Sequence, residues 1–481
     1  MQQNLPKRHV YTLVKTGSKI YHPKMEEHME TNLTKGSVLK NVISFSLPYL
    51  LSYFLQTLYG MADLFIIGQF EGKASITAVS VGSQVMHMLT VIIVGLAMGS
   101  TVSIAQAVGA GRKKRASRCI GNTITLFLIL SILLTILLLF LVNPIVTAMA
   151  TPEAAAAGTA CYLTICFMGI PFITAYNIIS SIFRGLGDSK SPMYFIAIAC
   201  AVNIGLDYLF MGVFHLGPAG AALGTTLSQT ISVGIALLFL LKRKPGIPLR
   251  KTDLKPKKYI LGGILKTGIP ISLQDGFIQI SFLVITIIAN SRGLTDAAAV
   301  GIVEKIISFL FLVPSSMLST VSALGAQNIG AGRKDRALQA LRYAILITTS
   351  FGFIAAVLMQ WIAQPVVGLF TEDSAVIFAG GQYLKGYIWD CFLAGIHFSF
   401  SGYFCACQRS EFSFLHNFFS IILVRIPGAY LTSKYFPHTL FPMGLATAAG
   451  SLLSVILCVL FFLTLRRKGH KTPVSSCPAN G

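Results

Sequence analysis

The chain has 481 residues, of which 54% are hydrophobic and only 11% carry a charge. Soluble globular proteins carry about 25% charged residues, so this composition excludes a water-soluble fold. The net charge of +21 would suit a nucleic-acid partner. No basic face is interleaved with exposed aromatic residues, however, and we therefore expect no nucleic-acid binding.

Twelve apolar stretches follow one another along the chain, and about 20 such residues cross the hydrocarbon of a bilayer. In lipid only a helix satisfies every backbone group within one segment. The sequence therefore predicts an all-α membrane protein with 12 transmembrane helices. The predicted spans are 37–67, 75–108, 118–143, 157–183, 191–213, 218–241, 259–291, 297–329, 338–364, 377–404, 412–433 and 440–465.

Lysine and arginine gather before the first span and after every second span. By the positive-inside rule, both termini are predicted to be cytoplasmic. Residues 1–36 contain no apolar core of a signal peptide, so the first span is expected to serve as the targeting signal. Met25 and Met29 are alternative start residues to Met1. The nine cysteines show no paired metal spacing and are interpreted as inert thiols.

The chain contains an internal repeat. The sequence AQAVGAGRKKRA at 105–116 returns as AQNIGAGRKDRA at 326–337, with Gln106 and Gln327 separated by 327 − 106 = 221 positions. One register through several landmarks predicts two six-helix lobes related by a pseudo-two-fold axis along the membrane normal. The predicted parts are a cytoplasmic segment (1–36), the N-lobe (37–241), a cytoplasmic interlobe linker (242–258), the C-lobe (259–466) and a cytoplasmic tail (467–481).

Ionisable residues are rare inside the predicted spans of the N-lobe. Each costs at least ~2.5 kcal/mol at bilayer depth, so each is a candidate functional residue. Asp63 lies in the first span, Asp207 and Asn203 share one face of the fifth, and Thr225 lies early in the sixth. If they converge, they can hold a proton or a small hard cation such as Na+. Two carboxylates in one dry pocket cannot both ionise cheaply, which suits a proton carrier. The alternative is structural, with Asp63 capping a helix and Asp207 pairing with a hydroxyl.

The C-lobe does not repeat this set. At the offset of 222 between Pro48 and Pro270, Asp63 falls on Ile285 and Asn203 falls on Arg425. The intramembrane charges of the C-lobe have both signs, and we expect them to neutralise one another or to line the cleft between the lobes, with a second ion site as the alternative. These possible cavity charges are Asp275, Glu304, Lys305, Asp390 and Arg425.

Catalytic signatures are absent from the sequence: it has no phosphate loop, nucleophile elbow or paired metal ligands. The chain is therefore interpreted as a transporter, not an enzyme, that needs no cofactor and uses an ion gradient. Pro48 removes a hydrogen bond from the first helix and permits it to bend.

Four motifs resemble the multidrug and toxic compound extrusion (MATE) family, in its DinF-like branch, over residues 33 to 466. They are Met61-Ala62-Asp63, the two Gln-x-x-Gly-Ala-Gly-Arg-Lys loops, the stretch 184–192 and Asn203-Ile204-Gly205-Leu206-Asp207.

The resemblance implies two six-helix lobes that form a V around a central cavity. It further implies secondary active multidrug efflux, in which small organic and often cationic compounds leave in exchange for H+ or Na+ by alternating access. In this reading Asp63, Asn203, Asp207 and Thr225 form the cation-coupling site, and protonation of Asp63 bends the first helix at Pro48 and shrinks the drug cavity. Apolar residues replace the seventh-span glutamate of the NorM-like branch, which favours protons.

A flippase and a membrane-embedded transferase are the alternative functions. A flippase for lipid-linked oligosaccharide or peptidoglycan precursors needs many cations to hold pyrophosphate. Few lysines or arginines lie in the spans, among them Lys40 near an end, Lys305 and Arg425. A membrane-embedded transferase needs a cluster of histidines or acids, and the histidines are dispersed. The expected partners are drug-like small molecules and the lipid bilayer, and the expected state is a multi-pass monomer in a bacterial inner or plasma membrane.

Overall fold

The chain is described here by a computed structural model that covers residues 32–243, 247 and 249–469. Parts of the predicted amino-terminal segment, the linker and the tail, with the alternative start residues Met25 and Met29, lie outside the described residues. Within these ranges every regular element is a helix, which confirms the predicted all-α class.

The first half of the chain contains the elements α1 (Val38–Phe70), α2 (Lys73–Gly109), α3 (Lys113–Phe140), α4 (Val142–Ala148), α5 (Glu153–Met168), α6 (Ile170–Gly185), α7 (Lys190–Asp207), the π-helix η1 (Tyr208–Val213) and α8 (Gly217–Arg243). A short 3-10 helix, η2 (Lys251–Leu254), lies between the halves.

The second half contains α9 (Lys258–Asn290), α10 (Leu294–Leu310), α11 (Leu312–Gly330), α12 (Lys334–Gly368), α13 (Ser374–Tyr387), α14 (Trp389–Ala406), α15 (Ser410–Ser420), the π-helix η3 (Ile421–Arg425), α16 (Ile426–Tyr435) and α17 (Phe441–Gly469).

Ten helical segments of the described chain are long and apolar enough to cross a membrane. The count rises to eleven when α5 and α6, which meet at a bend of 49°, are taken as one broken span. The pair α13 and α14 covers the predicted span 377–404 but does not belong to these eleven. The number of twelve spans therefore stays a prediction.

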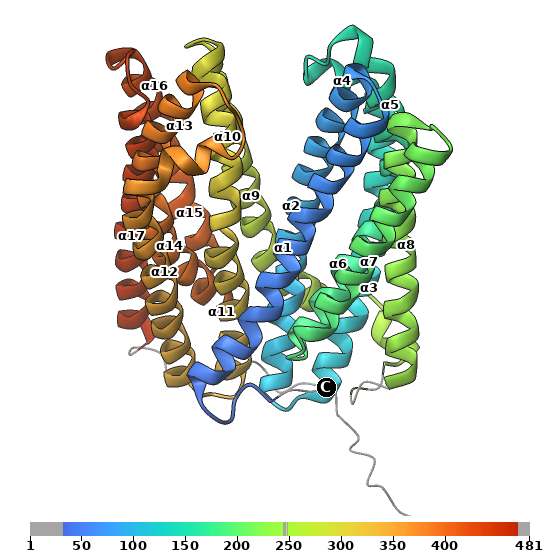
Figure 1. The fold of residues 1–481 in the computed structure, drawn as a ribbon. Coiled ribbons are helices and arrows are strands. Elements are labelled where there is room, and N and C mark those ends of the chain that lie inside the picture. Colours follow the sequence, from blue (N-terminus) through green and yellow to red (C-terminus); the bar gives the residue numbers. More distant parts are fainter. Residues whose placement is uncertain (1–31, 244–246, 248, 470–481) are drawn as a thin grey trace, which may run out of the picture.

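The two halves form two groups of helices. Figure 1 shows α1–α8 on one side and α9–α17 on the other, close together at the bottom of the view and apart at the top. Helix α2 packs against α9 and α11, and α1 also packs against α11, so these four helices join the groups. We call the two groups the N-lobe and the C-lobe.

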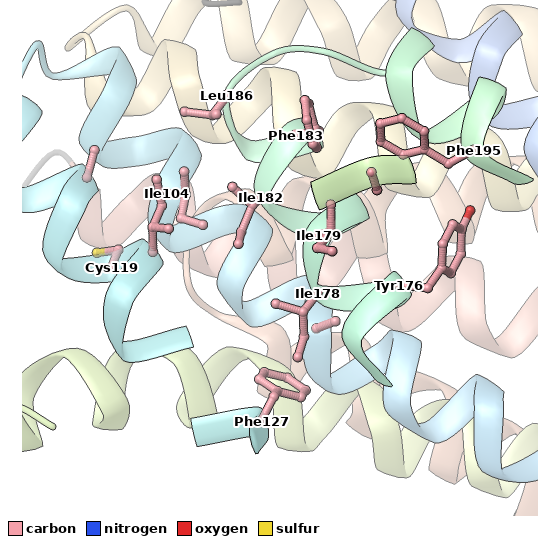
Figure 2. Close-up of a cluster of buried hydrophobic side chains, with 14 of the residues drawn as sticks. Ile104, Cys119, Phe127, Tyr176, Ile178, Ile179, Ile182, Phe183, Leu186 and Phe195 are labelled. Carbon is pink, nitrogen blue, oxygen red and sulfur yellow. The ribbon is translucent and has the colours of Figure 1, made fainter. Parts of the chain in front are cut away.

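Each lobe has its own apolar core. In the N-lobe, Ile104 of α2 and Phe183 of α6 are fully buried beside Phe195 of α7, and Figure 2 shows these side chains converging from separate helices. Phe183 and Phe195 meet edge to face, with ring centroids 5.5 Å apart. Close packing of this kind holds helices that lipid alone would not press together.

The repeated glutamines bridge the lobes. The Gln106 side-chain nitrogen donates to the carbonyl of Ala406 at the end of α14 (2.8 Å), and that of Gln327 donates to the carbonyl of Gly185 at the end of α6 (3.2 Å). The two bonds obey the offset of the repeat, since 406 − 185 = 221. Gly109 and Gly330 permit this approach, because a Cβ at either position would collide with the backbone carbonyl of the opposite glutamine. We call this pair of contacts the glutamine latch.

The residues before α1 also cross to the C-lobe. Arg333 donates to the carbonyl of Thr34 (2.7 Å), and Arg336 donates to the carbonyl of Gly36 (2.9 Å). The backbone N–H of Leu33 donates to the side-chain oxygen of Gln327 (3.3 Å). This strap, residues 33–36, therefore ties the start of the N-lobe to the same end of the C-lobe that carries the latch.

The linker between the lobes is clamped onto α3. The Asp253 carboxylate accepts hydrogen bonds from the Ser117 hydroxyl (2.8 Å) and from the backbone N–H of Arg250 (3.0 Å). Asn122, which is fully buried, donates to the carbonyl of Asp253 (3.1 Å) and accepts from the backbone N–H of Lys257 (2.6 Å). The described part of the linker is therefore fixed to the N-lobe.

Candidate functional site

The N-lobe residues that the sequence singled out meet in one place. Asp63 comes from α1, Asn203 and Asp207 from α7, and Thr225 from α8. The Asp63 carboxyl interacts with the side chains of the other three residues. Asp63, Asn203 and Asp207 are at most 2% exposed, and Thr225 is 8% exposed. Three helices therefore deliver two carboxyls, an amide and a hydroxyl to one buried volume, which we call the N-lobe site.

Hydrogen bonds fix one side of the N-lobe site. The Thr225 hydroxyl donates to one Asp63 oxygen (3.2 Å). Tyr59, one turn before Asp63 on α1, donates to the carbonyl of Thr225 (3.2 Å), and its hydroxyl lies 3.4 Å from that of Ser228. These contacts hold α1 and α8 in register around the carboxylate.

The other side of the site is unsatisfied by the protein. The second oxygen of Asp63, both oxygens of Asp207 and both side-chain polar atoms of Asn203 are buried without a hydrogen-bonding partner among the described residues. Such groups are costly to bury, so they need a proton, an ion or water to complete them. Gly224 lies against the open oxygen of Asp207, where a Cβ would collide with it.

The donor set decides what the site can hold. Carboxylate, amide and hydroxyl oxygens are ligands for hard cations and acceptors for a proton. The described residues contain no group of three or more His, Cys, Asp or Glu arranged around a metal position. Two carboxyls with neutral oxygens are more typical of a site for a proton or a monovalent cation than of one for a transition metal.

The C-lobe charges divide into two sets. Arg425 lies close enough to Glu304 and Asp390 for their charges to interact. Asp275 of α9 instead accepts from Gln274 (3.3 Å) at the contact between α9 and α2. Lys305 is exposed on α10. The structure therefore brings Arg425, Glu304 and Asp390 together, with the exposed Lys305 next to Glu304 on α10, and leaves Asp275 apart on α9.

Contact ion pairs do not join these groups. Arg292–Asp296 and Arg409–Glu411 are ion pairs with N···O distances within 4.0 Å, and neither pair includes one of these charges. Arg425 instead donates to the Tyr387 hydroxyl (2.7 Å). Asp390 is fully buried, and neither of its oxygens has a hydrogen-bonding partner among the described residues.

Pro48 is buried inside α1, which continues as one helix through it. The carbonyl of Pro48 accepts a bond from the Ser52 hydroxyl (2.7 Å).

Seven of the eight described cysteines are buried or half-buried, and Cys161 is exposed.

Sequence reasoning missed Tyr59, Ser228 and Gly224. Tyr59 precedes Asp63 by four residues and Ser228 follows Thr225 by three, so helical spacing alone predicts that each shares a face with a known member of the site. Gly224 carried no such signal, because its role depends on how closely α7 approaches α8.

Comparisons with known proteins agree with one another. The MatE family model matches residues 48–209 and 270–431, one stretch in each lobe. The probable multidrug resistance protein YpnP of Bacillus subtilis (strain 168) is 30% identical over 440 residues, which cover 92% of this chain and 98% of that protein. The probable multidrug resistance protein YoeA of the same strain is 28% identical over 409 residues, 84% of this chain and 88% of that protein.

A solved structure has the same fold. It is described as the outward-facing conformation of a multidrug resistance MATE family transporter of the MOP superfamily. The TM-score is 0.86 at 23% sequence identity, and the match covers 92% of this chain and 99% of that one. At this identity the likeness supports the architecture of the lobes.

Proposed function

Because the chain belongs to the MatE family, we propose that it is a secondary active exporter that moves small organic compounds out of the cell in exchange for a cation. The relatives named as probable multidrug resistance proteins support this class of substrate. The observation that carries the proposal is the convergence of Asp63, Asn203, Asp207 and Thr225, with buried carboxylate oxygens that lack protein partners.

The coupling ion is proposed to be a proton. Two ionised carboxylates in one buried volume repel each other, and a proton taken up by Asp63 or Asp207 removes that repulsion. The neutral acid can also donate a hydrogen bond, which one of the open oxygens nearby can accept. Since Asp63 lies on α1 and Asp207 on α7, a change of protonation changes how these two helices attract each other.

The geometry links this site to the lobes. Helix α1 carries Asp63 near one end and contacts α11 of the C-lobe, and the strap lies at its other end. A bend at Pro48 would therefore move the outer part of α1 against the C-lobe while the strap keeps its beginning in place. Coupling in this scheme is an attraction between α1 and α7 that the proton switches on.

The test is transport of a fluorescent organic cation into everted membrane vesicles, whose outer face is the cytoplasmic one, under separately imposed H+ and Na+ gradients. We expect transport under the H+ gradient, and we expect Asp63→Asn to reduce it to the rate of vesicles without the protein. Asp335→Asn, which neutralises an exposed acid at the start of α12, is the matched control and should keep the wild-type rate.

Each other outcome has a distinct meaning. Transport driven by Na+ alone would keep the function and change the ion. Full transport by Asp63→Asn would move the ion site elsewhere. An absence of drug efflux under both gradients would contradict the exporter and favour the flippase.

A further inference from the structure

The C-lobe contains a buried charge cluster at the place that mirrors the N-lobe site. Tyr162 and Tyr383 are repeat partners, since 383 − 162 = 221, and both are buried. Tyr162 is close enough to interact with Asp63, and Tyr383 is close enough to interact with Arg425, Glu304 and Asp390. A buried tyrosine therefore marks the same position beside both clusters.

The signs of the charges differ between the two places. The repeat pairs Asn203 of the N-lobe with Arg425 of the C-lobe. It pairs Asp63 of the N-lobe with Ile285 of the C-lobe, which is fully buried. In the C-lobe the acids come from other helices, with Glu304 on α10 and Asp390 on α14. The N-lobe site thus contains acids without a fixed cation, whereas the C-lobe contains acids with one.

Arg425 is held firmly. It is 7% exposed and is the last residue of the π-helix η3, and π-helical turns occur frequently at functional sites. Its guanidinium donates to the Tyr387 hydroxyl (2.7 Å) and lies 5.0 Å from the centre of the Phe282 ring, within cation–π range. An arginine side chain does not lose its proton in a protein, so this charge is permanent.

The acids around Arg425 do not form contact ion pairs with it. Both oxygens of Asp390 are buried without a hydrogen-bonding partner among the described residues, and the two oxygens of Glu304 share the Thr286 hydroxyl (3.5 and 3.3 Å). Removing one member of a buried charge group leaves the rest uncompensated, at a cost in stability. If the guanidinium were absent, these oxygens and the Tyr387 hydroxyl would form a set of hard ligands.

We propose that Arg425 is a tethered cation that permanently occupies the C-lobe counterpart of the N-lobe site. The C-lobe then takes up no coupling ion, and neutralising Arg425 creates a site for an alkali cation on Asp390, Glu304 and Tyr387. This inference deepens the proposed function and rests on it, because it assigns ion coupling to the N-lobe alone.

Binding is measured without transport, as the thermal midpoint of the purified protein in detergent with NaCl, KCl or choline chloride at equal ionic strength. All variants carry Asp207→Asn, which disables the N-lobe site. With Arg425 intact, the midpoint should be the same in the three salts. With Arg425→Gln it should fall in choline chloride and rise by several degrees in NaCl or KCl, and adding Asp390→Asn should abolish that rise.

Arg425→Lys is the matched control: it keeps a tethered charge and should show no salt-specific rise. If Arg425→Gln does not fold, the pair Arg425→Gln with Asp390→Asn decides, because removing both charges should restore folding. An unfolded double variant would overturn the proposal, as would a folded Arg425→Gln with equal midpoints in all three salts. So would a rise in NaCl with Arg425 present that Asp390→Asn removes. Efflux by protein without Asp207→Asn is measured in parallel, so a failure of the exporter is distinguished from a failure of this inference.

Discussion

A single glycine sets the geometry of the N-lobe site. Gly224 of α8 lies against the open oxygen of Asp207, and a Cβ there would collide with this oxygen and displace the carboxylate. We expect Gly224→Ala to reduce cation-driven efflux by about tenfold, equal to about 1.4 kcal/mol, while the protein still folds. The measurement is the initial rate of efflux at matched protein levels.

The same helix provides the control for this substitution. A Cβ at Gly234 meets nothing within 4 Å, and alanine is the better helix former. Gly234→Ala should therefore transport at the wild-type rate. Equal losses in the two variants would mean that Gly224 acts through the helix and not through Asp207.

At this scale the sequence predicted the members of the N-lobe site but not its shape. Asp63, Asn203, Asp207 and Thr225 stood out because polar residues are rare in apolar spans, and the structure brings them together. The C-lobe was harder to interpret, because a list of charges does not reveal which of them share a pocket. Whether a charge such as Arg425 is buried, and which other charges lie near it, depends on tertiary packing.

The linker helix η2 contains one charged group, the Asp253 carboxylate, that helps to bind the linker to α3. Burial by itself would raise the pKa of the Asp253 carboxyl, but hydrogen bonds from Ser117 and from the Arg250 backbone, and the nearby charges of Arg118 and Arg250, outweigh it and leave the pKa below its ordinary value. A carboxyl with a lowered pKa in the folded state stabilises that state above the unfolded pKa, and the contribution is lost as the pH falls through the folded value.

The clamp should therefore be fully formed at neutral pH and weaken only under acid. We expect amide-hydrogen exchange in residues 250–257 to stay slow from pH 7 down to about 4, the ordinary pKa range of aspartate, and protection to fall below that. Asp253→Asn should lose the acid-dependent part of this protection throughout the range. An unchanged exchange rate in this variant, with Asp335→Asn as the exposed control, would assign the clamp to the uncharged hydrogen bonds of Asn122 and Thr125.

Helix boundaries were better predicted than helix breaks. Hydropathy located 157–183 and 297–329 as spans, yet each contains two helices, α5 with α6 and α10 with α11. Hydropathy reports what is buried in lipid, and both sides of a break are equally apolar. The prolines offered the remaining signal, since Pro171 and Pro314 lie in the first turn of the second helix of each pair, a position that proline favours.

The glutamine latch joins the two lobes by one side-chain hydrogen bond in each direction. Removing both side chains leaves the carbonyls of Gly185 and Ala406 without these bonds, so we expect the double variant Gln106→Ala with Gln327→Ala to populate a state in which the lobes separate at the latch. Spin labels at the exposed positions Lys114 and Asp335 should report a second, longer distance. Gln360→Ala is the control, because Gln360 donates to the carbonyl of Lys385 within one lobe (3.2 Å).

An unchanged distance distribution in the double variant would mean that other contacts between α2, α9 and α11 hold the lobes. The repeat predicted that the two glutamines occupy equivalent positions in the two halves. That each glutamine bonds to the opposite lobe could not be predicted, because a repeat relates positions and says nothing of how the copies pack.

The strap, the linker and the latch all lie at the same end of the molecule. Together they affect the free energy needed to separate the lobes at that end. Because both lobes belong to one chain, the latch re-forms without a search in solution, and two hydrogen bonds of about 1 kcal/mol each suffice to hold it. One elementary charge that crosses a membrane potential of 100 mV releases about 2.3 kcal/mol. If one proton drives transport, as proposed above, its entry releases about as much free energy as the two bonds of the latch hold, so we expect a single proton to be enough to open it.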